Sequence, residues 1–261
     1  MTTAAPQTRI VSWFSCGAAS AVATKIALAK ADPAREFVIA YCEIKEEHPD
    51  NMRFLKDCER WFGQEVVILG NDDYGRSIYE VFAKTRYLKG PSGARCTGEL
   101  KKRVRHEFQL AGDLLVMGYT AEEARRAKRF TAQNFDANLW PVLIEAGLTH
   151  ADCLAMVERA GVALPEMYRL GYTHNNCVGC VKGEAGYWNK IRIDFPEVFA
   201  RMSAMEQELG RTVCKREWTE NGERKLERIA LKDLPPDAGN YGAEPEIQCG
   251  ILCAIAESDF N

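Results

Sequence analysis

Four short apolar runs, each rich in β-branched or aromatic residues, recur through the first half of this chain with helical patterns between them. They occupy residues 9–14, 37–42, 65–69 and 114–118. Runs of this length bounded by turn residues are typical of buried strands. Parallel strands need a crossover, usually a helix, so the alternation predicts an α/β fold with a doubly wound parallel sheet. Ligands on such sheets bind at the carboxyl ends of the strands, which makes the following loops the first candidates for a site.

The rest of the chain carries clear end signals for helices and one signal for a hairpin. A capping box, Thr149 and Asp152, begins one helical pattern. Another helical pattern starts at Pro196 and ends at Gly210, since glycine readily terminates helices. Asn221-Gly222 lies between two strand patterns and predicts a tight turn, so we expect a β-hairpin near the C-terminus.

Ten cysteines in 261 residues could form disulfides or bind metal. The start of the chain is polar and lacks the charged and apolar segments of a secretory signal, which predicts a cytoplasmic protein with reduced thiols. No run approaches the roughly 18 apolar residues that span a bilayer, so we expect a soluble protein without a membrane partner. The net charge of −3 argues against a protein that coats polyanions generally, and any anion recognition must therefore be local.

Five of the cysteines stand at positions that indicate shared chemistry. Cys177 and Cys180 form a Cys-x-x-Cys pair, with Cys96 far upstream and Cys249 and Cys253 near the C-terminus. Two sulfurs at this spacing can reach one ion, and four thiolates suit either a [4Fe–4S] cluster or tetrahedral zinc. We expect metal binding, with a purely structural zinc as the plainer alternative. The other five cysteines fall mostly on apolar faces and are interpreted as buried, inert thiols.

The segment Ser15–Ser20 reads Ser-Cys-Gly-Ala-Ala-Ser and joins the first expected strand to an alanine-rich helix. Backbone N–H groups and hydroxyls at a helix N-terminus form a ready anion site. The plainer interpretation is a tight turn in which Ser20 caps the helix. Neither the Walker spacing nor the Rossmann glycine triplet is present, so the loop belongs to neither of those nucleotide-binding classes.

This loop resembles the PP-loop of the adenine-nucleotide α-hydrolase superfamily, in which a Ser-Gly-Gly-x-Asp-Ser type sequence cradles phosphate or sulfate. Residues 43–54 are similar to the superfamily's nucleotide-contacting segment, and residues 117–126 are similar to its substrate motif. The three segments follow one another in the superfamily's order. Ala19 stands where ATP-cleaving members usually keep an aspartate, so the resemblance favours the phosphoadenylyl-sulfate (PAPS) reductase branch.

The resemblance implies a PP-loop nucleotide-binding domain over 1–170 and a cysteine-containing, metal-binding C-terminal extension over 171–261 that packs on it and includes the hairpin. It also implies an anion and nucleotide site formed by Ser15, Cys16, Gly17, Ala18, Ser20, Glu43, Gly118, Arg125 and Arg126. The two arginines would clamp phosphate or sulfate, because guanidinium groups pair bidentately with such anions. The plainer interpretation of the basic runs at 101–105 and 125–129 is solvated helix faces.

In the cluster-containing reductases of this family, a Cys-Cys pair before a basic helix and a distant Cys-x-x-Cys hold a [4Fe–4S] cluster. Cys96, Cys177 and Cys180 match three of these ligands, while Arg95 occupies the position of the fourth. Cys253 is the candidate replacement, and an iron site left open to bind sulfur is the alternative.

Residues 248–253 resemble the Glu-Cys-Gly-Ile/Leu-His tail of PAPS and adenylyl-sulfate (APS) reductases, whose cysteine attacks the sulfonate sulfur. Cys249 matches this nucleophile, and Leu252 replaces the histidine. Alternatively, Cys249 and Cys253 cycle between thiols and a disulfide, or both ligate metal. An exposed thiol without a role is the plainest interpretation of Cys249.

We therefore expect a PAPS reductase-like oxidoreductase that acts on an activated sulfur group carried by an adenine nucleotide. Cys249 would be the catalytic thiolate and a thioredoxin-like protein the reductant. The alternative is an ATP-dependent sulfur transferase that thiolates tRNA or DNA, whose phosphates the basic runs would bind. A nucleotide or metal sensor without turnover is the third hypothesis. We also expect the protein to be a homo-oligomer.

Overall fold

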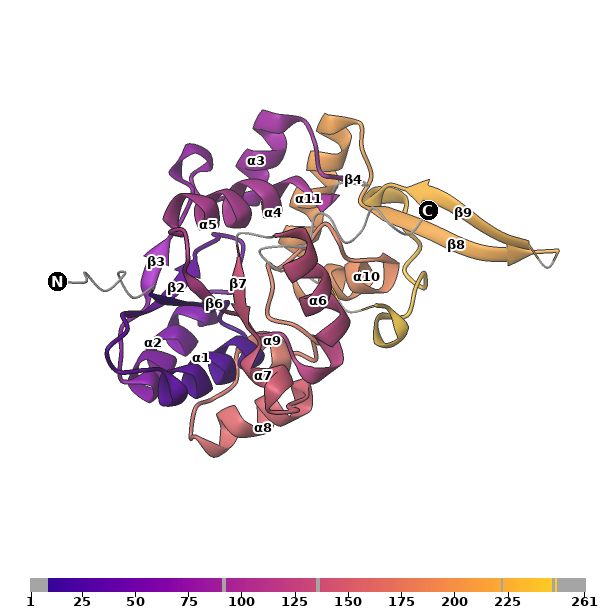
Figure 1. Ribbon diagram of the computed structural model, residues 1–261. Coiled ribbons are helices and arrows are strands. Elements are labelled where there is room, and N and C mark those ends of the chain that lie inside the picture. The colour runs from indigo at the N-terminus through magenta and orange to yellow at the C-terminus, as the bar shows by residue number, and fades with distance from the viewer. Residues whose placement is uncertain (1–8, 91–92, 135–136, 222, 246, 248–261) are drawn as a thin grey trace. The chain divides into compact units, whose positions relative to one another are not determined.

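The structure, a computed structural model, describes residues 9–90, 93–134, 137–221, 223–245 and 247 (Figure 1). The described residues fall into two compact units that interleave along the chain. Unit 1 takes the segments Met1–Glu43, His48–Gly70 and Val104–Asn175, and unit 2 takes Ile44–Glu47, Asn71–Arg103 and Asn176–Asn261. This division differs from a single boundary at residue 170, because the segment 71–103 joins the C-terminal unit.

Unit 1 is built on a five-stranded parallel sheet, as the alternation of patterns predicts. The strand order is β3-β2-β1-β6-β7. The strands are β1 (Ile10–Trp13), β2 (Phe37–Cys42), β3 (Val67–Leu69), β6 (Leu114–Val116) and β7 (Asn138–Trp140). Neighbouring strands run parallel, with Val11 of β1 opposite Val38 of β2 and Leu115 of β6. The predicted strands are confirmed, and β7 is an addition that the sequence pattern does not predict.

The helices of unit 1 lie between and after these strands. They are α1 (Ala18–Lys30), α2 (Asp50–Phe62), α5 (Arg103–Phe108), η3 (Ala121–Glu123), α6 (Ala124–Gln133), α7 (Val142–Glu145), α8 (His150–Arg159) and α9 (Glu166–Arg169). The predicted capping box begins α8: the Thr149 hydroxyl accepts from the Asp152 N–H at 3.2 Å, and the Asp152 carboxylate accepts from the Thr149 N–H at 2.9 Å. Each member of the box thus satisfies a backbone donor of the other.

The side chains of β1 alternate between two helical layers, which is the arrangement of a doubly wound fold. On one face, Ser12 Oγ lies 2.8 Å from Thr24 Oγ1 of α1. On the opposite face, Trp13 packs edge-on against Phe108 of α5, with ring centroids 6.0 Å apart. The sheet of unit 1 is therefore covered by helices on both sides.

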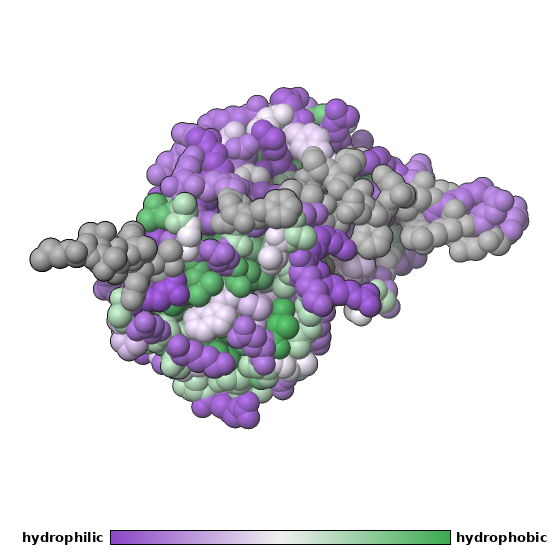
Figure 2. All heavy atoms as spheres, in the orientation of Figure 1, coloured by the Kyte–Doolittle hydropathy of each residue, from purple (hydrophilic) through white to green (hydrophobic). Residues whose placement is uncertain are grey.

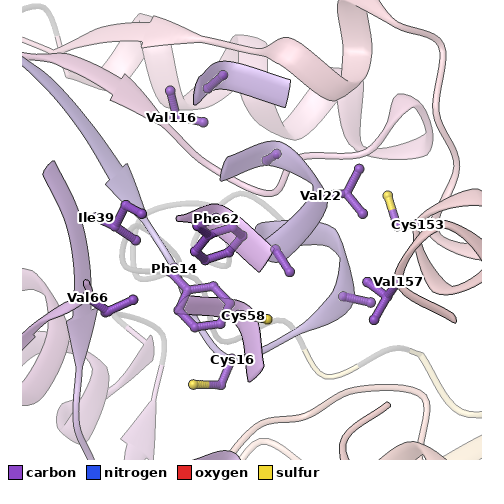
Figure 3. Packing of buried hydrophobic residues seen from close by; sticks show 14 of the residues in the cluster. Phe14, Cys16, Val22, Ile39, Cys58, Phe62, Val66, Val116, Cys153 and Val157 are labelled. Carbon is purple, nitrogen blue, oxygen red and sulfur yellow. The ribbon is translucent and has the colours of Figure 1, made fainter. Parts of the chain in front are cut away.

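The main core of unit 1 surrounds α1 (Figure 3). Val22 of α1 points toward Cys153 and Val157 of α8, and all three side chains are fully buried. Phe14, which follows β1, packs edge-on against Phe62 of α2, with ring centroids 5.6 Å apart. Because the expected anion loop starts directly after Phe14, this core supports its base.

Unit 2 combines short helices with two antiparallel strand pairs. Its elements are η1 (Asp72–Tyr74), α3 (Ile78–Thr85), β4 (Lys89–Gly90), β5 (Gly93–Ala94), α4 (Arg95–Thr97), η2 (Gly98–Lys102), α10 (Ala185–Asp194), α11 (Pro196–Leu209), β8 (Cys214–Glu220), β9 (Glu223–Ile229), η4 (Leu231–Asp233) and η5 (Tyr241–Ala243). One antiparallel pair is β4 with β5, and the other is β8 with β9.

The helix and hairpin predicted near the C-terminus are confirmed. Helix α11 ends at Gly210, whose φ is 60°, and β8 and β9 form a hairpin around Asn221, whose φ is 53°. Glu206 of α11 joins both ends of the hairpin, because its carboxylate accepts from the N–H groups of Val213 at 2.5 Å and Leu231 at 2.6 Å. Burial raises the pKa of this carboxyl group.

In Figure 2, hydrophilic side chains cover the region of α3 at the top of the view. Hydrophobic side chains reach this face mainly in unit 1. In the part of the chain that the structure describes, no helix is both long and apolar enough to cross a bilayer.

Candidate functional site

The loops that follow β1 and β6 meet at the carboxyl end of the unit 1 sheet. From β1 the sheet continues to β2 and β3 on one side, and to β6 and β7 on the other. The junction of β1 and β6 is therefore a topological switch point, where open α/β sheets bind ligands. A Cβ atom on Gly118, which follows β6, would lie 2.7 Å from the backbone nitrogen of Ser20 in α1. The two segments are thus in direct backbone contact where the sequence predicts a site.

The Cys16 loop, defined as Ser15–Ser20, forms the start of α1. Gly17 is the N-cap residue; within the described residues no side chain caps the helix, and its first turn holds no acidic residue. The Ser20 hydroxyl donates to the Gly17 carbonyl oxygen at 2.9 Å and accepts from the Ser15 N–H at 3.0 Å. Ser20 therefore shapes the loop from within the first turn and is not the N-cap. A helix start of this kind offers its first N–H groups to an anion.

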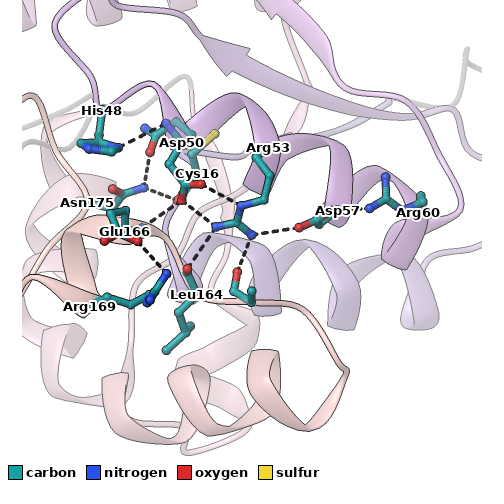
Figure 4. A network of polar contacts seen from close by, with 12 residues as sticks. Cys16, His48, Asp50, Arg53, Asp57, Arg60, Leu164, Glu166, Arg169 and Asn175 are labelled. Carbon is teal, nitrogen blue, oxygen red and sulfur yellow. Dashed lines mark hydrogen bonds and ion pairs between the residues drawn. The ribbon is translucent and has the colours of Figure 1, made fainter.

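Cys16 occupies a backbone conformation that few residues other than glycine adopt. Its φ is 56°, and its side chain is fully buried. Its carbonyl oxygen accepts from Nδ2 of Asn175 at 2.6 Å, and the same nitrogen donates to Oδ1 of Asn51 in α2 at 2.8 Å. Figure 4 shows Asn175 beside Cys16. Asn175 is not predicted from the sequence, because no motif or spacing connects it with a loop 159 residues away.

The other predicted anion-site residues also lie in unit 1. Glu43 follows β2 and is half-buried. Arg126 of α6 pairs with Glu123 at 2.5 Å, whereas Arg125 is exposed on the same helix. The structure thus places Gly118 against the Cys16 loop, and Arg126 forms an ion pair with Glu123.

An ion-pair network anchors α2 to the segment before α9 (Figure 4). Arg53 donates to both carboxylate oxygens of Asp50, at 2.8 and 2.6 Å, and to Asp57 at 2.8 Å. It also donates to the carbonyl oxygens of Ala163 and Leu164, at 2.8 and 3.1 Å. The hydrogen bonds from Arg53 hold the pKa of Asp50 below its usual range. The network therefore fixes α2, whose first residues belong to the predicted nucleotide segment 43–54.

The loop Cys177–Cys180 of unit 2 surrounds the hydroxyl of Tyr187 in α10. Tyr187 Oη accepts from the N–H groups of Gly179 and Cys180, at 3.0 and 2.9 Å, and lies 3.4 Å from the carbonyl oxygen of Cys177. Gly179 has φ 76°, so a residue with a side chain would be strained there. Both thiols are buried. This contact is not predicted from the sequence, since the Cys-x-x-Cys spacing does not indicate which side chain fills the loop.

The short segment Ile44–Glu47 contacts both regions of unit 2 that carry candidate metal ligands. The carbonyl oxygen of Glu46 accepts from the Val178 N–H, in the Cys-x-x-Cys loop, at 2.8 Å. The Glu47 carboxylate pairs with Lys101 at 3.5 Å, in the helical stretch that follows the first candidate ligand. The Cys-x-x-Cys loop and the helical stretch after Cys96 therefore both contact the segment Ile44–Glu47.

The candidate metal ligands that the structure describes are buried in unit 2, including Cys96. Among the described residues, no three Cys, His, Asp or Glu side chains are arranged to hold a metal ion, and no disulfide joins two cysteines. Cys249 and Cys253 lie outside the described residues. One feature suits a sulfur-rich group: the buried Tyr79 hydroxyl has no hydrogen-bond partner in the described part of the chain. Burial, with smaller contributions from neighbours that include Cys177, raises the pKa of this hydroxyl to about 12.

The cysteines interpreted as inert are all buried, as predicted: Cys16, Cys42, Cys58, Cys153 and Cys214. Burial raises the pKa of Cys153 and of Cys214 to about 12. Burial also lowers the pKa of Lys89, an effect that the nearby Cys214 opposes. Cys153 and Cys214 are therefore protonated at neutral pH, which suits thiols that serve packing.

No family model, no curated protein and no solved structure matches this chain. The PP-loop resemblance stays a prediction, and the function is inferred from the two sites themselves.

Proposed function

We propose that the protein is a PAPS reductase-like enzyme that binds an adenine nucleotide carrying an activated sulfur group at the Cys16 loop. The observation that carries the proposal is the backbone contact between Gly118 and the start of α1. This contact joins the loops after β1 and β6 at the switch point of a parallel sheet. The helix start without a side-chain cap supports binding of phosphate or sulfate there. The PP-loop resemblance contributes the class of nucleotide.

In this proposal, the terminal phosphate or sulfate binds to the hydroxyls of Ser15 and Ser20 and to the N–H of Gly17. The two hydroxyls now hydrogen-bond each other at 3.1 Å, and this bond would be exchanged for bonds to the anion. Arg125 and Arg126 would neutralise the negative charge, because guanidinium groups pair well with such oxyanions.

Cys249 acts as the nucleophile in this proposal. Its thiolate attacks the sulfur of the nucleotide, the bond between that sulfur and the phosphate oxygen breaks, and the adenine nucleotide leaves with the electron pair. The product is an S-sulfonate on Cys249. A dithiol such as a thioredoxin-like protein then supplies two electrons, which releases sulfite and restores the thiol.

A [4Fe–4S] cluster, or a zinc ion as the alternative, is part of the proposal. Cys96, Cys177 and Cys180 would hold it together with Cys253, because thiolates are suitable ligands for both. The burial of the three described thiols in one unit and the Tyr79 hydroxyl without a described partner support a sulfur-rich group there. When bound, such a group would position and polarise the substrate without changing its own oxidation state.

The second candidate is an ATP-dependent sulfur transferase that acts on tRNA or DNA. It needs an exposed basic surface for nucleic-acid phosphates. In the basic run after Cys96, however, Lys101 is buried and paired with Glu47, and Arg105 is also buried. These two charges do not contribute to an exposed surface, which favours the reductase.

Assays with PAPS and with APS, each in the presence of a dithiol, test the proposal. We expect release of sulfite, which Cys249→Ser should abolish and Cys153→Ala, the control in a buried helix position, should retain. Release of pyrophosphate from ATP with tRNA or DNA, without any sulfite, would reject the reductase in favour of the transferase. Nucleotide binding without turnover, unchanged in Cys249→Ser, would indicate a sensor.

Anaerobic purification, followed by a visible spectrum and by iron, sulfide and zinc analysis, tests the metal. We expect iron and sulfide in similar amounts, lost in Cys177→Ser and kept in Cys153→Ala. A colourless protein that contains zinc alone would reject the iron–sulfur cluster, and a protein without metal would reject both.

A further inference from the structure

We propose that Asn175 is a positioning residue, which fixes the peptide group between Cys16 and Gly17 so that the Cys16 loop presents its N–H groups to an anion. The identity of that anion rests on the proposed function, whereas the contact itself is a property of unit 1. Asn175 lies 159 residues after Cys16 and belongs to no part of the loop motif.

Asn175 holds the loop through two hydrogen bonds from one amide nitrogen. Nδ2 donates to the Cys16 carbonyl oxygen at 2.6 Å and to Oδ1 of Asn51 at 2.8 Å. Asn175 is 6% exposed and Asn51 is 2% exposed, so both bonds are shielded from water. Shielded bonds of this kind are strong, because no water competes for the donor. The amide therefore joins the Cys16 loop firmly to α2.

The direction of the Cys16 carbonyl group decides which way the next N–H group faces. The described peptide bonds are trans, and in a trans peptide the C=O and the N–H that follows it point in opposite directions. With its oxygen held by Asn175, the peptide group turns the Gly17 N–H away from Asn175, at the N-cap of α1. If the peptide group turned over, a carbonyl oxygen would replace a donor at the start of the helix and would repel an anion.

The backbone of Cys16 needs such a restraint. At φ 56° a residue with a Cβ atom is in the left-handed region, which is less favourable than the ordinary regions. Cys16 stands where the PP-loop sequence has its first glycine, a residue that adopts this region without strain. A loop with cysteine at this position therefore depends on a hydrogen bond that glycine would not need, and Asn175 supplies it.

The thiol of Cys16 reports on the loop, because it is fully buried and can react only when the loop opens. Iodoacetamide treatment of the full-length protein, followed by mass spectrometry of each cysteine, measures this opening. Asn175→Leu keeps the branching and the number of heavy atoms of the side chain but removes both donated bonds, so we expect Cys16 to react about tenfold faster. Cys153 in α8 is the internal reference and should react at its wild-type rate.

Asn176→Leu is the matched control. Asn176 donates to the carbonyl oxygen of Ile247 in unit 2, at 2.8 Å, and its loss should leave the Cys16 rate unchanged. An unchanged Cys16 rate in Asn175→Leu would overturn the proposal. Equal acceleration of Cys16 and Cys153 would also overturn it, since Asn175 would then support the whole of unit 1.

Calorimetry of ATP and PAPS binding to the same variants tests whether Asn175 supports anion binding. We expect Asn175→Leu to bind about tenfold more weakly than the wild-type protein, and Asn176→Leu to bind normally. If the wild-type protein binds neither nucleotide, the proposed function fails, while the Cys16 rates still decide the role of Asn175. If the wild-type protein binds a nucleotide and Asn175→Leu binds it with equal affinity, the role of Asn175 in anion binding is overturned.

Discussion

Single residues decide the shape of the Cys16 loop. Gly118 has no side chain at the point where the chain after β6 meets α1, and Cys16 adopts a positive φ at the start of the same helix. A methyl group at residue 118 would lie 2.7 Å from the nitrogen and 2.9 Å from Cα of Ser20. Backbone atoms at a helix start cannot yield as a long side chain can, so the added group would displace the loop.

Gly118→Ala should therefore lower the free energy of unfolding by about 2 kcal/mol, the usual cost of overpacking. Chemical denaturation measures this change, and nucleotide affinity should fall with it. Gly98→Ala is the control, because a Cβ atom there meets nothing within 4 Å and no positive φ is involved. If Gly118→Ala proves as stable as Gly98→Ala, the contact between the two segments is not as close as described.

Side chains on two helices of this protein form hydrogen bonds with the backbone of neighbouring segments and so hold those segments in place. Arg53 of α2 donates to the carbonyl oxygens of Ala163 and Leu164, and Tyr187 of α10 accepts from two N–H groups of the Cys-x-x-Cys loop. Buried backbone groups are costly when unpaired, so these contacts define the conformation of the segments that they serve. The segment before α9 and the Cys-x-x-Cys loop are therefore each held by a neighbouring helix.

The pKa of Asp50 is lowered in the folded protein, chiefly by its hydrogen bonds from Arg53. A lowered carboxyl pKa adds stability above the unfolded-state pKa of about 4, and this stability is lost as the pH falls through the folded-state value. Asp50→Asn should thus lower the free energy of unfolding by about 1 kcal/mol at pH 7. The difference from the wild-type protein should shrink as the pH falls below about 4.

Denaturation curves from pH 7 to pH 2 measure the effect of Asp50→Asn. Lys56→Met is the control, since Lys56 pairs with Glu59 on the same helix but its side chain is 60% exposed. It should change stability little at any pH. A difference between Asp50→Asn and wild type that does not depend on pH would show that the ion pair does not stabilise the fold.

Tyr187→Phe should loosen the Cys-x-x-Cys loop, because two buried N–H groups lose the oxygen that accepts from them. We expect the free energy of unfolding to fall by about 2 kcal/mol, and Cys180 to react faster with iodoacetamide. Tyr79→Phe is the matched control, since its buried hydroxyl has no partner among the described residues, and it should be neutral or stabilising. Equal behaviour of the two variants would contradict the role of the Tyr187 hydroxyl.

For the molecule as a whole, strand order determines where a site can form. Strands β1 and β6 are neighbours in the sheet, although the paired residues Ile10 and Leu114 are 104 positions apart in the chain. Their shared end is fixed by Arg9, just before β1, which donates to both oxygens of Asp113, just before β6, at 3.0 and 3.1 Å. Asp113 is 1% exposed, so this carboxylate depends on its partner.

Arg9→Leu should lower the free energy of unfolding by about 3 kcal/mol, because it leaves a buried carboxylate without its cation. The double variant Arg9→Leu with Asp113→Asn removes that charge and keeps an oxygen to accept from the Leu110 N–H, so it should recover part of the loss. Urea denaturation of both variants measures this. If the double variant were less stable than Arg9→Leu, the ion pair would not be the cause.

The sequence predicts those parts of the fold that depend on short stretches of chain. The apolar runs predict four strands, the Thr149 capping box predicts the start of α8, and Asn221-Gly222 predicts the hairpin. Strand β7 is missed, because Asn138–Trp140 contains no β-branched residue and belongs to the sheet only through its pairing with β6. The Cys16 loop is also found from the sequence, since a turn between a strand and a helix has a local signature.

The contacts that complete the candidate sites are decided only in three dimensions. Asn175 reaches Cys16 across 159 residues, and Arg53 reaches Leu164 across 111. No sequence pattern marks such pairs, because periodicity and turn chemistry describe neighbours along the chain, whereas hydrogen bonds depend on distance in space. The sequence by itself thus determined the elements and the loop between β1 and α1. The tertiary structure decided which distant side chains hold that loop, since only chain packing brings their donors and acceptors together.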